Sequence, residues 1–185
     1  MIRKIAVTAF ILLLGACQAT APMKSPVTYS PDYARAVNSV VKGVCLDNLG
    51  ATDGMYAALE EIGAPLVEVD EIGKYRKIRK YAAPNEDGRV VAIVSVTSNG
   101  SVCGVAWKRS RIPYDQVVDN LDGVTMLDGL HSHLLVGYSN DRKYAVLVGS
   151  VKNLTEPDAD IVIFLSDRAY KDQRQYIKLP EIDLK

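Results

Sequence analysis

Apolar residues recur at three- and four-residue spacing after Ser30-Pro31, and this pattern predicts a helix. Serine suits the N-cap, and proline suits the first helical position, where its missing N–H would have no partner. Gly50 is placed to close this helix. The apolar stripe consists of Tyr33, Val37, Val40, Val41, Val44 and Cys45. One side of the helix is therefore expected to be buried.

A second helix is expected between Thr52, as its cap, and Gly63, as its C-terminal glycine. Its buried face would carry Met55, Ala58, Leu59 and Ile62. Only a few residues separate the two helices, so they are expected to form a helical hairpin.

The next stretch predicts a brief strand over 66–69 and a helix over 71–82. The helix is favoured because Tyr75, Ile78 and Tyr81 recur at every third position. Basic residues crowd the rest of its surface: Lys74, Arg76, Lys77, Arg79 and Lys80. A basic face with aromatic neighbours indicates an anionic partner.

The clearest strand signal is a pair of apolar runs, 89–97 and 102–107, joined by Ser98-Asn99-Gly100-Ser101. Asn-Gly predicts a two-residue type I′ turn. With that turn the facing pairs are Val96 and Cys103, Val94 and Val105, and Ala92 and Trp107, all on one face. The opposite face, with Val91 and Ile93, is partly apolar too, so the hairpin is expected near the centre of a sheet.

The remaining pattern predicts a short helix from Pro113 to Gly123, carrying Val117, Val118 and Leu121. Four further strands are expected over 124–127, 134–138, 144–148 and 161–165, and the tail from Lys171 is polar and weakly specified. The expected fold is α+β: an antiparallel sheet of about five or six strands, with the N-terminal helix pair packed on one face.

The N-terminus has a different pattern. Arg3 and Lys4 precede an uncharged apolar run over 5–14, which ends in Leu14-Gly15-Ala16-Cys17. Ten helical residues span roughly 15 Å, about half of a bilayer's hydrocarbon thickness, so the run is expected to be a cleaved signal peptide rather than a membrane span.

Leu14 to Cys17 resembles the lipobox of bacterial lipoproteins. The resemblance implies a lipid on the Cys17 thiol and cleavage before it, and Gln18, which is not aspartate, implies the outer membrane. An ordinary secretory signal and a Gram-positive surface are the alternatives. The chain then divides into a signal peptide, 1–16, a lipidated cysteine with a flexible tether, 17–29, and a single globular domain, 30–185, facing the periplasm or the cell surface.

Composition excludes one class of partner. The chain carries 22 basic and 22 acidic residues, and the signal segment removes two basic ones, which leaves a net charge of about −2. Nucleic acid is therefore an unsuitable partner, and the expected compartment disfavours it as well. No cofactor is expected.

If Cys17 is lipidated, Cys45 and Cys103 are the remaining thiols in an oxidising compartment. Both lie on predicted buried faces, so a disulfide is expected to join the first helix to the hairpin. The alternative, a redox couple, needs a close C-x-x-C pair, which this spacing does not offer.

His131 and His133 are the chain's two histidines. On a strand both imidazoles would point to one side, but a zinc site needs a third ligand, and Asp128 is the nearest candidate. The alternative is a pair of solvated imidazoles. G-x-S-x-G and phosphate-binding glycine motifs are absent, and Ser132 would point away from both histidines, so no catalytic residue is assigned.

The basic residues at 74–80 and the cluster Lys108, Arg109 and Arg111 are the surface candidates for an anionic partner. Lipid headgroups, envelope polymers and acidic proteins fit that chemistry. The alternative is a solvated basic face balanced by Glu68, Asp70 and Glu71.

Together these patterns predict a lipid-anchored outer-membrane lipoprotein with a non-catalytic binding or structural role, whose partners are the membrane and an envelope protein or anionic polymer. Two alternatives remain open. One is an envelope hydrolase or metal-binding protein that uses His131 and His133, and the other is an accessory subunit of a secretion or envelope-assembly complex.

Overall fold

The computed structural model describes residues 31–72, 76–109, 111–112, 114–129, 134–151 and 159–184. In these ranges the chain forms an eight-stranded antiparallel open sheet in the order β1-β2-β3-β4-β8-β7-β6-β5. The strands are β1 Leu66–Ile72, β2 Arg76–Pro84, β3 Val90–Thr97, β4 Val102–Lys108, β5 Val124–Met126, β6 Leu135–Ser139, β7 Tyr144–Val151 and β8 Ala159–Ser166. The helices are α2 Pro31–Val40, η2 Val41–Leu46, α3 Thr52–Glu61, α4 Tyr114–Val118 and α5 Asp167–Arg174.

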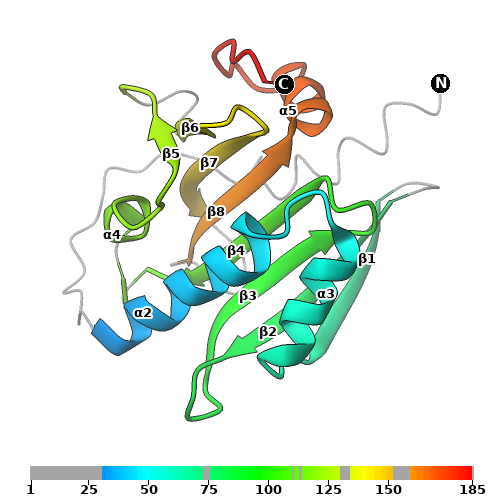
Figure 1. The fold of residues 1–185 in the computed structure, drawn as a ribbon, viewed down its shortest axis with the longest axis vertical. Helices are drawn as coiled ribbons and strands as arrows, with labels where there is room; N and C mark the ends of the chain where they lie inside the picture. Colours follow the sequence, from blue (N-terminus) through cyan, green and yellow to red (C-terminus); the bar gives the residue numbers. More distant parts are fainter. Residues whose placement is uncertain are drawn as a thin grey trace.

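The α+β class and the placement of the N-terminal helices on one face of the sheet are confirmed (Figure 1). The predicted strand count is wrong, because the sheet has eight strands in the described ranges rather than five or six. The predicted helix over 71–82 is also wrong. Residues 76–84 form β2, which lies between β1 and β3.

The helix prediction was based on the three-residue spacing that Ile78 and Tyr81 share. In β2 the two residues lie on opposite faces of the sheet, with Ile78 facing Asp70 and Thr97, and Tyr81 facing Leu66 and Val94. Tyr81 packs against the core beneath the helices. Pairing with a strand on each side therefore overrides the high helix propensity of arginine and lysine.

The predicted stripe of the first helix is confirmed, but the helix changes type within it. Beyond α2, the η2 segment has π-helical geometry, and the Asp47 N–H donates to the Lys42 carbonyl five residues earlier. Val41, Val44 and Cys45 are buried in this segment. The wider turn therefore continues the buried face of α2 toward the sheet.

The hairpin register is confirmed for all three predicted pairs, and β3 and β4 lie inside the sheet as expected. The type I′ turn is wrong, since Gly100 has a positive φ of 64° and Asn99 does not. The Gly100 N–H donates to the Thr97 carbonyl at 2.9 Å, so the turn lies one residue earlier. A β-carbon at Gly100 would stand 2.7 Å from Thr52 Oγ1, where the turn meets the start of α3.

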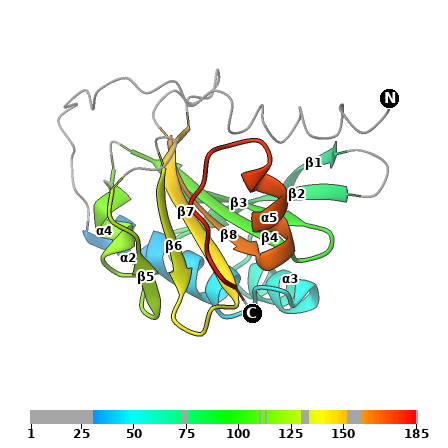
Figure 2. The same ribbon diagram turned by 90° about the horizontal axis from the view of Figure 1, so that it is seen from above.

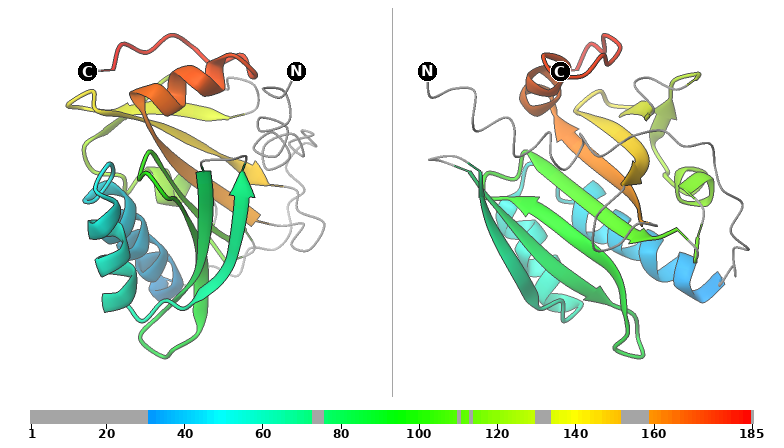
Figure 3. Two further views of the ribbon diagram at one scale, coloured as in Figure 1. Left: turned by 90° about the vertical axis from the view of Figure 1, so that its right-hand side faces the viewer. Right: turned by 180° about the vertical axis from the view of Figure 1, so that it is seen from behind.

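Helices cover both faces of the strongly twisted sheet, α2 and α3 on one face and α5 on the other (Figure 2 and Figure 3). An apolar core lies on each face. The first lies beneath α2, η2 and α3 and includes Val37, Val41, Met55, Leu59, Val94, Val105 and Phe164. The second lies beneath α5 and the C-terminal tail and includes Leu147, Leu165, Tyr170, Leu179, Ile182 and Leu184. The tail predicted to be weakly specified thus supplies three buried apolar side chains.

Tyr170 fastens the C-terminal tail to α5, because its hydroxyl donates to the Pro180 carbonyl at 3.0 Å and its side chain is 1% exposed. Burial raises the pKa of Tyr170 from its ordinary value of 10.0 to about 12. The folded chain therefore holds this proton to higher pH than the unfolded chain does. The stabilisation from this difference is fully present below pH 10 and is lost as pH rises toward 12.

We predict that replacing Tyr170 with phenylalanine flattens this alkaline loss of stability by about 2 kcal/mol. At neutral pH the same variant loses one hydrogen bond, worth about 1 kcal/mol. Urea unfolding at a series of pH values above 9 measures both effects. Tyr176→Phe is the control because Tyr176 is 46% exposed. Equal alkaline slopes for wild type and Tyr170→Phe would contradict the prediction.

Candidate functional site

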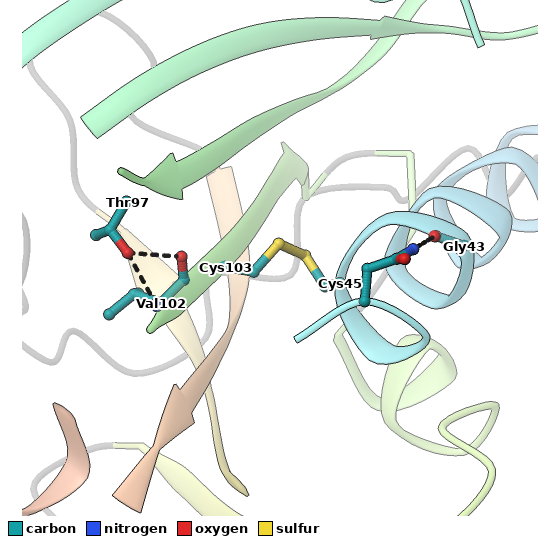
Figure 4. The surroundings of a disulfide bond; sticks show 6 residues. Gly43, Cys45, Thr97, Val102 and Cys103 are labelled. Carbon is teal, nitrogen blue, oxygen red and sulfur yellow. Dashed lines mark hydrogen bonds between the residues drawn. A yellow bond between two sulfur atoms is a disulfide. The ribbon is translucent and has the colours of Figure 1, made fainter. Parts of the chain in front are cut away.

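The predicted disulfide is present and joins Cys45 of η2 to Cys103 of β4 (Figure 4). The two Cα atoms are 5.6 Å apart, and both side chains are fully buried. The bond crosses the first core from the helix to the centre of the sheet. Its burial and its 58-residue separation fit a structural role.

The basic run on β2 is paired with the acidic strand β1 beside it. Lys80 Nζ lies 2.7 Å from Glu68 Oε2 and 2.8 Å from Asp70 Oδ2. Lys77 Nζ lies 2.9 Å from Glu71 Oε1. Glu68, Asp70 and Glu71 are the three acidic residues that the alternative interpretation expected to balance the basic run.

Two further observations describe the surroundings of Lys80 and Arg79 in this run, and the anionic partner stays a prediction. Burial alone would lower the pKa of Lys80, but the hydrogen bonds to Asp70 and Glu68 and the negative charges of these two carboxylates together outweigh burial, and its pKa is raised. Arg79 lies on the opposite face of β2, with its guanidinium carbon 5.0 Å from the ring centre of Tyr56 in α3. Lys74 lies outside the described residues, and Arg76 begins β2.

In the second basic cluster, Arg109 also has an acidic partner. Arg109 Nε donates to Asp160 Oδ1 at 2.8 Å, and the Ser150 hydroxyl donates to the same oxygen at 2.8 Å. Asp160 is 0% exposed, although it lies near the start of β8. Sequence reasoning missed this residue, because a single aspartate before an apolar run resembles a turn residue.

Lys108 and Arg111 are exposed and lie beside an open cleft of about 480 Å³. The cleft lies between the start of α2, the β2–β3 turn and the end of β4. Its charged and polar lining includes Asp32, Tyr33, Asp87, Arg89, Lys108 and Arg111. The Tyr33 hydroxyl donates to the Val91 carbonyl at 2.6 Å and accepts from the Lys108 N–H at 3.3 Å. The mixture of charges gives this cleft no strong preference for an anion.

The histidine hypothesis stays a prediction, because His131 and His133 lie outside the described residues, while Asp128 is exposed. Among the residues with a described position, no three His, Cys, Asp or Glu side chains are close enough together to hold a metal ion. Cys17 also lies outside the described ranges.

The surface that sequence reasoning missed is the edge of the sheet at β1. Four of the six large apolar side chains that are exposed in the described part of the chain lie between residues 62 and 69: Ile62, Leu66, Val67 and Val69. Val67 is 55% exposed and Val69 is 45% exposed. The other edge strand, β5, has only three residues. Exposed apolar clusters of this kind mark interaction surfaces more often than isolated apolar residues do.

No family model, curated protein or solved structure matches the chain. Within the described ranges, every helix is too short or too polar to cross a bilayer.

Proposed function

We propose that this protein is a lipid-anchored lipoprotein of the cell envelope, held in the outer membrane through Cys17, with a non-catalytic role in binding another envelope component. The observation that carries the proposal is Leu14-Gly15-Ala16-Cys17 at the end of a short apolar run. The Cys45–Cys103 disulfide gives weaker support, since such bonds persist mainly in oxidising compartments.

The tether limits where the partner lies. Residues 17–29 extend at most about 45 Å, so the domain stays close to the membrane that holds its lipid. A partner within this reach would be another envelope protein or a polymer near the membrane surface. The exposed apolar edge at β1 supports a protein partner over a polymer, because it joins apolar side chains to a row of backbone groups.

Replacing Cys17 with alanine is expected to release the protein from the membrane fraction. The thiol is the atom that would carry the acyl chains, and several chains together make an anchor effectively permanent. Fractionation of cells that express the wild type or the variant measures the effect. Ser25→Ala is a matched control, since it makes a similarly small change close to Cys17 and leaves both the lipobox and the disulfide intact. Equal membrane-bound fractions for wild type and Cys17→Ala would contradict the proposal.

The binding role has a separate test. Photo-crosslinking side chains at several exposed positions of the full chain, introduced in cells, are expected to capture a defined envelope protein from at least one position. If every position on the described surface captures only abundant bystanders, the binding role is wrong.

A further inference from the structure

We propose that β1 binds its partner by accepting an extended segment of it as an additional strand of the sheet, and that this segment alternates apolar with basic side chains. The inference rests on the proposed binding role and names the chemistry of the partner. Three observations carry it: outward backbone groups, exposed apolar side chains and the acidic character of β1.

The direction of the backbone groups follows from the pairing of β2. The Lys77 carbonyl accepts from the Ser98 N–H at 2.8 Å, so the backbone of Lys77 points toward β3. Its partner in β1 is Glu71, whose N–H and C=O therefore point away from β2. Because the direction alternates along a strand, Val69 also presents its N–H and C=O at the open edge. A partner strand would find two donors and two acceptors at these residues.

Apolar side chains lie beside these backbone groups. Val69, together with Leu66 and Ile62, remains exposed after the sheet and helices have formed. The register shifts between Leu66 and Glu68, so the regular part of the edge runs from Glu68 to Ile72. Such a short, regular edge suits strand addition by a peptide segment, in which backbone bonds give affinity and side chains give selectivity.

The acidic residues of β1 indicate which kind of partner segment would bind there. The regular part of β1 contains Glu68, Asp70 and Glu71 and has no basic residue. On its inner side β1 already pairs with a basic strand, where Lys80 lies within 3 Å of both Glu68 and Asp70. A partner strand with lysine or arginine at alternate positions would place cations beside the same carboxylates from the outer side.

The same charges disfavour a second copy of this chain. Antiparallel pairing of two β1 edges through Val69 would place Glu68 opposite Asp70 of the second copy. Shifting the register by one step places Asp70 opposite Asp70, and a further step places Glu71 opposite Glu71. Like charges directly opposite each other are destabilising, so all three registers carry a penalty.

The probe for the test is a capped eight-residue peptide, Lys-Val-Arg-Ile-Lys-Val-Arg-Ile, in which basic and apolar residues alternate as the proposal requires. The control peptide carries glutamate at every arginine and lysine. Binding to the full chain in detergent is measured by fluorescence anisotropy. We expect the basic peptide to bind at least about tenfold more tightly than the control, an advantage that shrinks with added salt. Equal affinities would overturn the proposed charge selectivity.

Amide hydrogen exchange locates the binding. On adding the basic peptide, the amides of Val69 and Glu71 should exchange at least about tenfold more slowly, while Glu68 and Asp70, whose N–H groups face β2, stay unchanged. If the peptide slows exchange at all four amides, or at none of them, the strand-addition geometry is overturned. Strong protection of Val69 and Glu71 before any peptide is added would overturn it too, because the edge would already be occupied.

A pair of variants separates the backbone contact from the side chain. Val69→Pro removes one outward N–H and should weaken peptide binding about tenfold, whereas Val69→Thr keeps the N–H and a similar shape and should bind within about threefold of wild type. If Val69→Pro does not fold, two N-methylated peptides replace it, one methylated at the odd residues and the other at the even residues. Only alternate N–H groups of an added strand point toward β1, so one of the two peptides must lose binding. Retention of binding by both peptides would overturn the proposal.

Failure of this inference is distinguishable from failure of the proposed function. A defined envelope protein crosslinked at other exposed positions but not at Val67 leaves the binding role standing and overturns the β1 site. Concentration-dependent dimers seen by sedimentation, and abolished by Val69→Pro, would assign the edge to a second copy and overturn the basic partner.

Discussion

Replacing both Cys45 and Cys103 with alanine is expected to lower the free energy of unfolding by about 4 kcal/mol. The disulfide closes a 58-residue span, so it removes many extended conformations from the unfolded chain. Both side chains are also fully buried between η2 and β4, and the two alanines would leave a small void there. For a domain of this size, about 4 kcal/mol is a large part of the total stability.

Guanidinium unfolding of the oxidised wild type and the double variant measures this difference. Reductant serves as the control, since it should destabilise the wild type and leave the double variant unchanged. A wild-type midpoint that does not move when reductant is added would contradict a stabilising disulfide.

Replacing Arg109 with methionine is expected to destabilise the fold by about 3 kcal/mol. The substitution removes the cation that donates to Asp160 at 2.8 Å and leaves the fully buried carboxylate without that charge partner. The hydrogen bond from Ser150 remains, but a neutral hydroxyl compensates a buried charge less well than a guanidinium does.

A second substitution shows whether the buried charge is the cause. Adding Asp160→Asn to Arg109→Met removes the charge itself and should recover most of the lost stability. Lys108→Met is the matched control, because Lys108 is exposed at the end of the same strand. If all three variants unfold at the same denaturant concentration, the Arg109–Asp160 pair contributes nothing measurable.

The parts of the fold that could be predicted from the sequence are those in which local and distant forces agree. The β3–β4 register follows from a short loop and from alternation, and all three predicted pairs are present. The stripe from Val37 to Cys45 follows from helical spacing, and that stripe is buried. The disulfide could be predicted because two independent patterns placed both cysteines on buried faces.

Residues 76–84 could not be predicted in the same way, because their spacing and their basic residues both favour a helix locally. Their strand conformation depends on pairing with β1 and β3, which no local pattern encodes. Which cations are free is likewise a tertiary property. Lys77 and Lys80 lie beside Glu71, Glu68 and Asp70 only after the two strands pair.

Asp160 and the β1 edge show the same limit for candidate sites. The burial of Asp160 depends on Arg109, which lies 51 positions away, so no motif marks it. The exposure of Val67 and Val69 depends on β1 being the last strand of the sheet, whereas an isolated alternating segment cannot reveal its position in the strand order.

The most direct test of the account is mass spectrometry of the N-terminal peptide of the protein isolated from cell envelopes. We predict a peptide that begins at Cys17 and carries the added mass of lipid acyl chains. An unmodified peptide that begins at Met1, or one cleaved elsewhere without lipid on Cys17, would contradict the lipid-anchored role from which the proposed binding function follows.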